Sequence, residues 1–279
     1  MDQNKSGFGT FGGVFVPNIL TILGVIMYLR LGWVVGNSGL RDTLIILLIA
    51  NVITLLTSLS ISLIATNMKM RGGGVYYMIS RSLGHEAGGS IGIPLYLAQA
   101  IGIGLYLTGF TESVINLFPN LNAILIRLSS LFLLTVLAMI SSKTVIRVQY
   151  LILSIVILSL FSFFLGKTPD PGSVNMAPGY SEGQDFWSVF AVFFPAVTGI
   201  LSGVSMSGDL RNPARSIPRG TLLSVMAGAI VYLAISLWLS ATATPGQLIT
   251  NKAIMIELAW WAPLVYAGIW GATLSSALA

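Results

Sequence analysis

Two long apolar stretches of this chain are each interrupted near the middle by small and helix-breaking residues. The first interruption contains Thr21 and Gly24, and the second contains Pro195, Thr198 and Gly199. A membrane helix bonds all its backbone groups internally, so unwinding it at mid-depth is costly unless the freed groups face a cavity or an ion. Amides freed at a helix start attract anions, whereas freed carbonyls and hydroxyls suit a weakly hydrated cation. The two interruptions therefore predict sites for small ions of both signs near the middle of a membrane.

Hydroxyl side chains form a third group, in the last apolar stretch of the chain. Thr273, Ser275 and Ser276 follow Ala272 there, and their oxygens are hard ligands that suit a sodium-sized cation. The alternative is that these hydroxyls bond to carbonyls one turn earlier in their own helix. Gly24 and Gly199 likewise have an alternative role, because small residues let membrane helices pack closely.

Titratable side chains are absent from the centres of the apolar stretches. The nine acidic residues fall in predicted loops or at the ends of predicted spans, and the one histidine, His85, falls in a predicted loop. Carrying a proton through a membrane usually needs a buried titratable relay, so proton coupling is disfavoured. Walker sequences, nucleophile motifs, paired histidines and metal-ligand spacings do not occur, and we expect neither an enzyme, an ATP-driven pump nor a bound cofactor.

The composition indicates a membrane protein. The 279 residues are 55% hydrophobic and 8% charged, whereas soluble domains carry roughly 25% charged residues. The formal net charge of +5 is best explained by basic loops on one membrane face rather than by binding of nucleic acid. No cleavable signal peptide is evident at the N-terminus, so we expect the first apolar stretch to remain as a helix.

Eight apolar stretches are long enough to cross a bilayer, which takes roughly 20 residues. They cover residues 14–36, 42–67, 88–115, 122–141, 147–166, 186–207, 219–242 and 257–279. With the N-terminus in the cytoplasm, nine basic residues fall on the cytoplasmic side and five outside, the orientation that the positive-inside rule favours. We therefore expect a multi-pass protein of the cell membrane with a cytoplasmic N-terminus.

The polar connection around residues 167–185 divides the predicted spans unequally. We expect a cytoplasmic segment (1–13), a first repeat of five helices (14–166), an extracellular loop (167–185) and a partial second repeat (186–279). The two interruptions lie 175 residues apart (199 minus 24), as expected for corresponding positions in two repeats. An inverted five-plus-five arrangement needs two more helices, so we expect the sequence to be truncated.

Several motifs resemble those of the cation–chloride cotransporters. The similar segments are residues 24–36 (GVIMYLRLGWVVG), 71–84 (RGGGVYYMISRSLG), 88–92 (GGSIG), 193–203 (FFPAVTGILSG), 207–210 (SGDL) and 217–221 (IPRGT). They occur in the expected order, and the similarity extends from about residue 12 to residue 279. The resemblance implies an all-α membrane protein of the amino acid–polyamine–organocation superfamily, with the LeuT-type inverted repeat and breaks in helices 1 and 6.

The resemblance also implies binding sites for chloride and potassium. One chloride ion would bind to the amides of Gly24, Val25 and Ile26, and a second to those of three residues in the second interruption: Gly199, Ile200 and Leu201. The residues implied for potassium are Thr21, Ile22, Tyr106, Pro195 and Thr198. Family members that carry potassium have asparagine at the position of Thr21, so this residue leaves potassium open, while Tyr106 favours it.

A sodium site and a gate are implied in the same way. Sodium would lie between the carbonyls of two residues in the first interruption and three residues of the last span: Leu20, Leu23, Ala272, Ser275 and Ser276. The branch of the family that carries potassium and chloride without sodium lacks the second serine, so Ser276 favours the sodium-coupled branch. Arg30 and Glu112 would form an extracellular gate; the alternative is two unrelated charges at the membrane surface.

The function predicted from these residues is secondary symport: sodium is carried together with chloride by alternating access. Whether potassium is carried as well is left open. One alternative is an amino acid permease of the same superfamily, although the residues before Gly24 are bulkier than the glycine-rich break of those permeases. A second alternative is a truncated partner subunit that does not transport. The expected partners are small inorganic ions, the lipid bilayer and a second copy of the chain in a homodimer, with no nucleic acid.

Overall fold

The computed structural model describes residues 7–68, 72–140, 142–167 and 174–278, and within these ranges the chain is almost entirely helical. Six of the described helical segments are long and apolar enough to cross a membrane. They are Phe11–Leu29, Leu31–Asn67, His85–Leu117, Thr144–Phe164, Phe186–Asp209 and Pro213–Thr242. Two shorter apolar helices, Ala123–Met139 and Ala262–Leu278, fall on the remaining two of the eight predicted stretches. The expected all-α membrane fold is confirmed.

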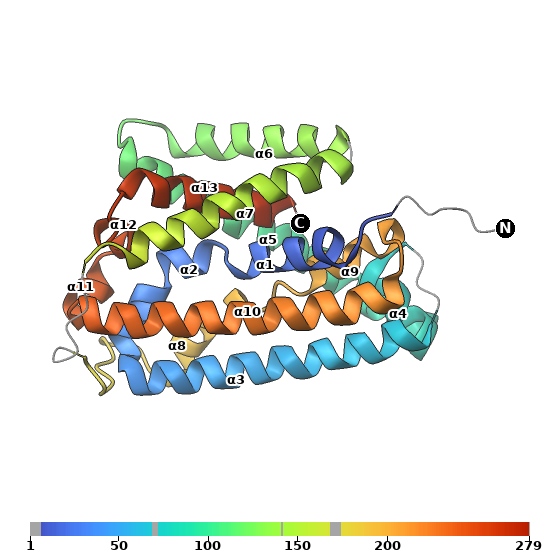
Figure 1. Ribbon diagram of the computed structural model, residues 1–279, viewed down its shortest axis with the longest axis horizontal. Helices are drawn as coiled ribbons and strands as arrows, with labels where there is room; N and C mark the ends of the chain where they lie inside the picture. Colours follow the sequence, from blue (N-terminus) through green and yellow to red (C-terminus); the bar gives the residue numbers. More distant parts are fainter. Residues whose placement is uncertain (1–6, 69–71, 141, 168–173, 279) are drawn as a thin grey trace.

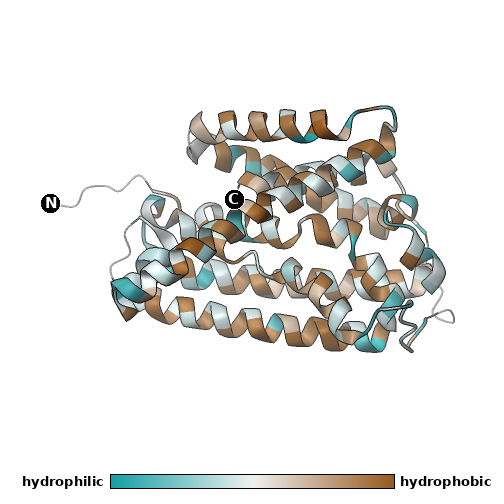
Figure 2. Cartoon of the chain, turned by 180° about the vertical axis from the view of Figure 1, so that it is seen from behind, coloured by the Kyte–Doolittle hydropathy of each residue, from teal (hydrophilic) through white to brown (hydrophobic). Residues whose placement is uncertain are grey.

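The helices lie roughly side by side along the long axis of the molecule (Figure 1). Helix α3 (Leu31–Asn67) packs most extensively against α10 (Pro213–Thr242), and α13 (Ala262–Leu278) against α7 (Ser142–Phe164) and α5 (His85–Leu117). The first helix of the chain lies between these two groups and contacts both α10 and α13. Hydrophobic residues cover the helices, whereas hydrophilic ones gather toward the two ends of the molecule, as in a protein that spans a bilayer (Figure 2).

The first helix is broken where the sequence predicts. A π-helical turn (Phe11–Phe15) leads into α1 (Val16–Ile22), and α2 (Val25–Leu29) follows after two non-helical residues. Leu23 has φ −83° and ψ 42°, and Gly24 has φ −88° and ψ −152°. Because these dihedral angles lie outside the helical region, the backbone groups on either side of the break lose their helical partners.

The sixth span is also broken as predicted. It consists of α8 (Phe186–Phe193), a 3₁₀ turn (Phe194–Val197) with Pro195 near its start, α9 (Leu201–Ser205) and a second 3₁₀ turn (Met206–Asp209). The start of α8 is fixed by a capping box between Asp185 and Ser188. Residues 198–200 between the two halves are non-helical, so the chain has both predicted breaks.

The connection between the first and second spans differs from the expectation. The predicted loop at residues 37–41 is replaced by a kink at Gly39, with φ 61° and ψ 176°, between two helical parts of α3. Glycine alone adopts this conformation readily, and a Cβ there would lie 2.2 Å from the carbonyl oxygen of Ala177. The later loop packs against this kink, because the Gly179 N–H donates to the Asn37 carbonyl at 2.9 Å.

Other boundaries differ by several residues, and short helices occur that the apolar pattern does not predict. These short helices are α4 (Gly74–Leu83), α11 (Pro245–Thr250) and α12 (Ile254–Glu257), whereas α6 (Ala123–Ile140) falls on the predicted stretch 122–141. Helix α10 begins six residues before the predicted residue 219, because Pro213 suits the first turn of a helix. Helix α13 begins five residues after residue 257, where α12 and a turn take up the chain. Some residues of the predicted divisions lie outside the described residues, namely 1–6, 168–173 and 279. The same holds for Arg71 of the second motif.

Candidate ion-binding site

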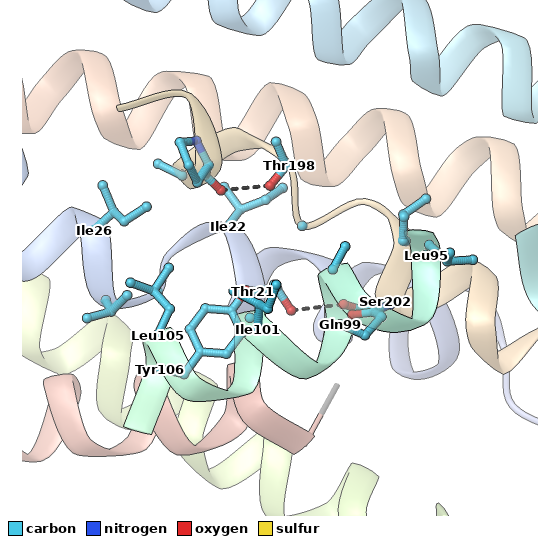
Figure 3. A pocket seen from close by; sticks show the side chains of 18 residues that line it. Thr21, Ile22, Ile26, Leu95, Gln99, Ile101, Leu105, Tyr106, Thr198 and Ser202 are labelled. Atoms are coloured by element: carbon cyan, nitrogen blue, oxygen red, sulfur yellow. Dashed lines mark hydrogen bonds between the residues drawn. The ribbon is translucent and has the colours of Figure 1, made fainter. Parts of the chain in front are cut away.

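The two breaks meet at one cavity of about 520 Å³, which α5 closes from the other side (Figure 3). Gly199 makes this meeting close: a Cβ on it would lie 2.7 Å from the Cβ of Thr21 and 2.9 Å from the amide nitrogen of Ile22. The five residues implied for potassium all line the cavity: Thr21, Ile22, Tyr106, Pro195 and Thr198. The structure therefore brings together residues that are up to 177 positions apart in sequence (198 minus 21).

Backbone carbonyls and hydroxyls supply most of the polar groups of this cavity. The Pro195 carbonyl accepts a hydrogen bond from the Thr198 hydroxyl at 2.8 Å. The Thr21 hydroxyl donates to the Pro17 carbonyl at 2.9 Å and lies 3.0 Å from the Ser202 hydroxyl. Thr21 is thus bonded within its helix and across to the other broken helix.

The residues implied for chloride are divided between the cavity and the core. Gly24, Val25 and Ile26 line the cavity at the start of α2, where the first amides of a helix have no intrahelical partner. From the second group, Gly199 and Leu201 line it as well. The third residue of that group, Ile200, is 3% exposed, and its N–H donates to the Thr198 carbonyl at 2.8 Å. In this conformation the Ile200 amide is therefore already bonded.

The residues implied for sodium lie beside the cavity rather than in its lining, where α13 packs against α1. The Ser276 hydroxyl donates to the Ala272 carbonyl at 2.8 Å and lies 3.3 Å from the Leu20 carbonyl oxygen. Ser275 is fully buried, and its hydroxyl has no hydrogen-bond partner among the described residues. A buried polar group without a partner is costly, so this hydroxyl fits a place where an ion or a water would supply the missing contact.

Arg30 and Glu112 form an ion pair at one end of the cavity region. The Arg30 guanidinium and the Glu112 carboxylate are 2.8 Å apart, and both side chains are about one-third exposed. Lys252, between α11 and α12, reaches the other oxygen of Glu112 at 3.1 Å. The sequence does not predict the contact between Lys252 and Glu112, because no pattern links a loop lysine to a carboxylate 140 positions away.

The cavity continues toward the opposite end of the molecule. A second hollow of about 290 Å³ lies beside the start of α4 and shares Leu95, Gln99 and Leu201 with the first. Its other lining residues include Gly73 and Ser205. The passage thus leads away from the Arg30–Glu112 ion pair.

Two buried polar residues that the sequence did not single out hold the breaks in place. Tyr232 of α10 donates its hydroxyl to the Ile22 carbonyl at 2.6 Å. The Asn18 side-chain oxygen accepts a hydrogen bond from the Gly203 N–H in α9 at 2.7 Å. Asn18 could have been selected from the sequence, because it is a lone amide side chain in an apolar stretch. Tyr232 could not, because a tyrosine within an apolar span does not by itself indicate a polar contact.

The sequence is similar to those of known membrane proteins. Residues 13–279 match the family model of the amino acid permeases. The chain is 33% identical to solute carrier family 12 member 1 from Oryctolagus cuniculus over 343 aligned residues, which cover 100% of this chain and 31% of that protein. It is 36% identical to solute carrier family 12 member 2 from Squalus acanthias over 334 residues, which cover 98% of this chain and 28% of that protein. The chain therefore spans about 30% of the length of these relatives. With a family model matched over nearly its whole length, the chain belongs to the amino acid permease family, and within that family it is similar to members of solute carrier family 12.

Proposed function

We propose that this protein is a symporter that couples sodium to chloride, with potassium as a candidate third ion, and moves them by alternating access. The observation that carries the proposal is the meeting of both broken helices at one cavity, where Gly199 lies against Thr21 and Ile22. Amides at the start of α2 suit an anion, and carbonyls of the same breaks suit a cation. An uncharged site of this kind has no preference for one sign and favours carrying both together.

Sodium coupling is supported by the hydroxyls beside the α1 break. Ser275 offers a buried hydroxyl without a partner among the described residues, and Ser276 lies 3.3 Å from the Leu20 carbonyl. Sodium prefers such hard oxygen ligands, and a bound ion would relieve the cost of burying the Ser275 hydroxyl.

Two residues of the cavity lining, Tyr106 and Thr21, bear on whether the cation bound there is potassium. Tyr106 lies in the lining of the cavity, opposite the carbonyls of the second break. Thr21 occupies the position where asparagine is expected in potassium-carrying members, and its hydroxyl already bonds to Pro17 and approaches Ser202. We therefore propose a cation site in the cavity, and ion-replacement flux determines which alkali cation it selects.

Alternating access is supported by the two ends of the passage. The ion pair of Arg30 with Glu112 lies at one end, and Lys252 adds a second cation to the same carboxylate. The cavity continues toward the other end, beside Gly73 and Gln99. With the N-terminus in the cytoplasm, as we propose for this protein of the cell membrane, this arrangement corresponds to a state closed outside and open inside.

Ion-replacement flux in liposomes tests the proposal. The purified chain is reconstituted, uptake of labelled chloride is measured while sodium and potassium are replaced one at a time, and uptake of labelled sodium is measured with and without chloride. We expect chloride uptake to require sodium, and any dependence on potassium identifies the third ion. Uptake of a labelled amino acid that chloride removal leaves unchanged would favour the permease, and a monodisperse chain without chloride-dependent flux would favour a non-transporting subunit.

A further inference from the structure

Tyr232 of α10 reaches the break of the first helix and bonds to its exposed backbone. The residue is fully buried, and its hydroxyl donates to the Ile22 carbonyl at 2.6 Å. Ile22 is the last residue of α1, so its carbonyl would pair in a continuous helix with the N–H of Ile26, which lies beyond the break in α2. The phenol of Tyr232 therefore takes the place of the helical donor that the break removes.

The position of this phenol is fixed by contacts with both broken helices. The ring of Tyr232 lies edge-on against Phe193 of α8, with centroids 5.3 Å apart and planes at 87°. One turn earlier in α10, a Cβ on Gly228 would lie 2.6 Å from a methyl carbon of Ile22, so α10 and α1 are in close contact. The hydroxyl consequently has little freedom to leave the Ile22 carbonyl.

Two other residues implied for the cation, Pro195 and Thr198, have carbonyls that accept hydrogen bonds from nearby donors. The Pro195 carbonyl accepts from the Thr198 hydroxyl at 2.8 Å, and the Thr198 carbonyl accepts from the Ile200 N–H at 2.8 Å. A carbonyl oxygen has two lone pairs, so each can accept one such bond and still contact an ion. Of these three carbonyls, and among the residues that the structure describes, only that of Ile22 has a donor from another span, the seventh.

We propose that Tyr232 is a positioning residue of the cation site, which holds the Ile22 carbonyl in the direction that binds a partly dehydrated alkali cation in the cavity. The inference rests on the proposed function, because it assumes a cation in that cavity. Since the distances between fixed oxygens decide which ion they fit, Tyr232 also contributes to the selection among alkali cations.

Replacing Tyr232→Phe tests this inference, because the variant keeps the ring against Phe193 and removes only the hydroxyl. The half-saturating concentrations of sodium, potassium, rubidium and chloride are measured by uptake in liposomes. Cation-dependent rises in unfolding temperature are measured on the solubilised chain. We expect the half-saturating concentration of the cavity cation to rise about tenfold, as for the loss of about 1.4 kcal/mol of binding. The ratio between potassium and rubidium should change, while the value for chloride stays within about twofold.

Tyr28→Phe is the matched control. Tyr28 is also a buried phenol, 1% exposed, but its hydroxyl bonds to the Ser159 hydroxyl at 2.5 Å instead of to a backbone group of the cavity. The Tyr28→Phe variant should lower the unfolding temperature without changing the ratio between the half-saturating concentrations of potassium and rubidium. Three results would overturn the inference. In Tyr232→Phe, the half-saturating concentrations of cation and chloride could shift equally, or that of the cation could stay unchanged. Alternatively, Tyr28→Phe could show the same cation shift as Tyr232→Phe. If the unmodified chain shows no response to any alkali cation in either measurement, the proposed function itself fails and this inference with it.

Discussion

At the scale of single residues, the two neighbouring serines of α13 differ in what satisfies their hydroxyls. The Ser276 hydroxyl bonds to the Ala272 carbonyl one turn earlier, which is the ordinary arrangement for serine in a membrane helix. The Ser275 hydroxyl is buried and lacks a partner among the described residues. The alternative interpretation, that these hydroxyls only bond back within their helix, therefore does not describe Ser275, and it is incomplete for Ser276, whose hydroxyl also lies 3.3 Å from the Leu20 carbonyl of α1.

Changing Ser275→Ala should separate the sodium site from ordinary packing. In sodium-free buffer we expect the unfolding temperature to stay the same or rise, because the change removes an unsatisfied buried hydroxyl. The rise that sodium causes in the unmodified chain should disappear. Ser58→Ala is the control, since Ser58 is equally buried but its hydroxyl bonds to the Thr54 carbonyl at 2.7 Å. A sodium response that survives in Ser275→Ala would remove this residue from the site.

Changing Ser276→Gly should abolish the sodium dependence of chloride uptake. The variant removes the oxygen that lies 3.3 Å from the Leu20 carbonyl, and with it a second hydroxyl ligand. The measurement is chloride uptake in liposomes as a function of sodium concentration. Undiminished sodium dependence would show that Ser276 serves only to bond α13 to α1.

At the scale of elements, the breaks were predictable because small residues and proline mark them directly. The dihedral angles of Leu23 and Gly24, and the 3₁₀ turn that contains Pro195, lie where the sequence placed the interruptions. At Gly39 the sequence predicted a loop rather than a kink within one helix, because the contact that leaves no room for a side chain there comes from a distant loop, through the carbonyl of Ala177. Local composition shows where a helix can unwind, whereas a kink imposed by another segment becomes visible only in three dimensions.

The same distinction applies to the site. Residues that belong to the breaks, such as Thr21 and Thr198, could be selected from sequence because they stand next to the helix-breaking residues. Lys252 and Tyr232 could not, because one lies in a loop and the other in an unbroken helix, and only packing brings each to its partner.

Changing Gly199→Ala should separate the two breaks and lower transport. The new Cβ would lie 2.7 Å from the Thr21 Cβ and 2.9 Å from the Ile22 amide nitrogen, and backbone cannot move aside cheaply. We expect chloride-dependent uptake to fall by about tenfold or more, which corresponds to roughly 1.4 kcal/mol in the barrier. The helical content measured by circular dichroism should be unchanged.

Gly104→Ala is the control for this variant. Gly104 lies in α5, and a Cβ on it would meet no atom within 4 Å. Alanine there should leave uptake unchanged or stabilise the helix slightly. Equal uptake in Gly199→Ala and Gly104→Ala would show that the close approach of the breaks is not needed for transport.

At the scale of the whole molecule, a cluster of ion pairs lies at one end of the passage, and the cavity continues into a second hollow away from it. The Glu112 carboxylate joins Arg30 of the first helix to Lys252 of a loop, so three separate segments meet in this cluster. Gln99, near the middle of α5, lies in the lining shared by the two hollows. If this arrangement is one state of an alternating-access cycle, weakening the ion pairs should depopulate it.

Cysteine labelling tests this relation, because the chain has no cysteine of its own. In a Gln99→Cys variant, we expect an impermeant thiol reagent to react from the cytoplasmic side of oriented vesicles. Adding Glu112→Gln removes the negative charge that Arg30 and Lys252 both contact, so the outward-open population should grow. The labelling rate should then fall by roughly two- to tenfold, which corresponds to a shift of up to about 1.4 kcal/mol in the equilibrium between the two states.

Glu257→Gln is the matched control for the loss of a carboxylate at the same end. Glu257 is exposed at the end of α12, and its carboxylate bonds to the Asn251 amide rather than to Arg30 or Lys252. Labelling of Gln99→Cys should therefore not change with this second variant. Equal rates in all three backgrounds would contradict the gate, since an ion pair that couples to the far end of the passage must change access there when it is broken.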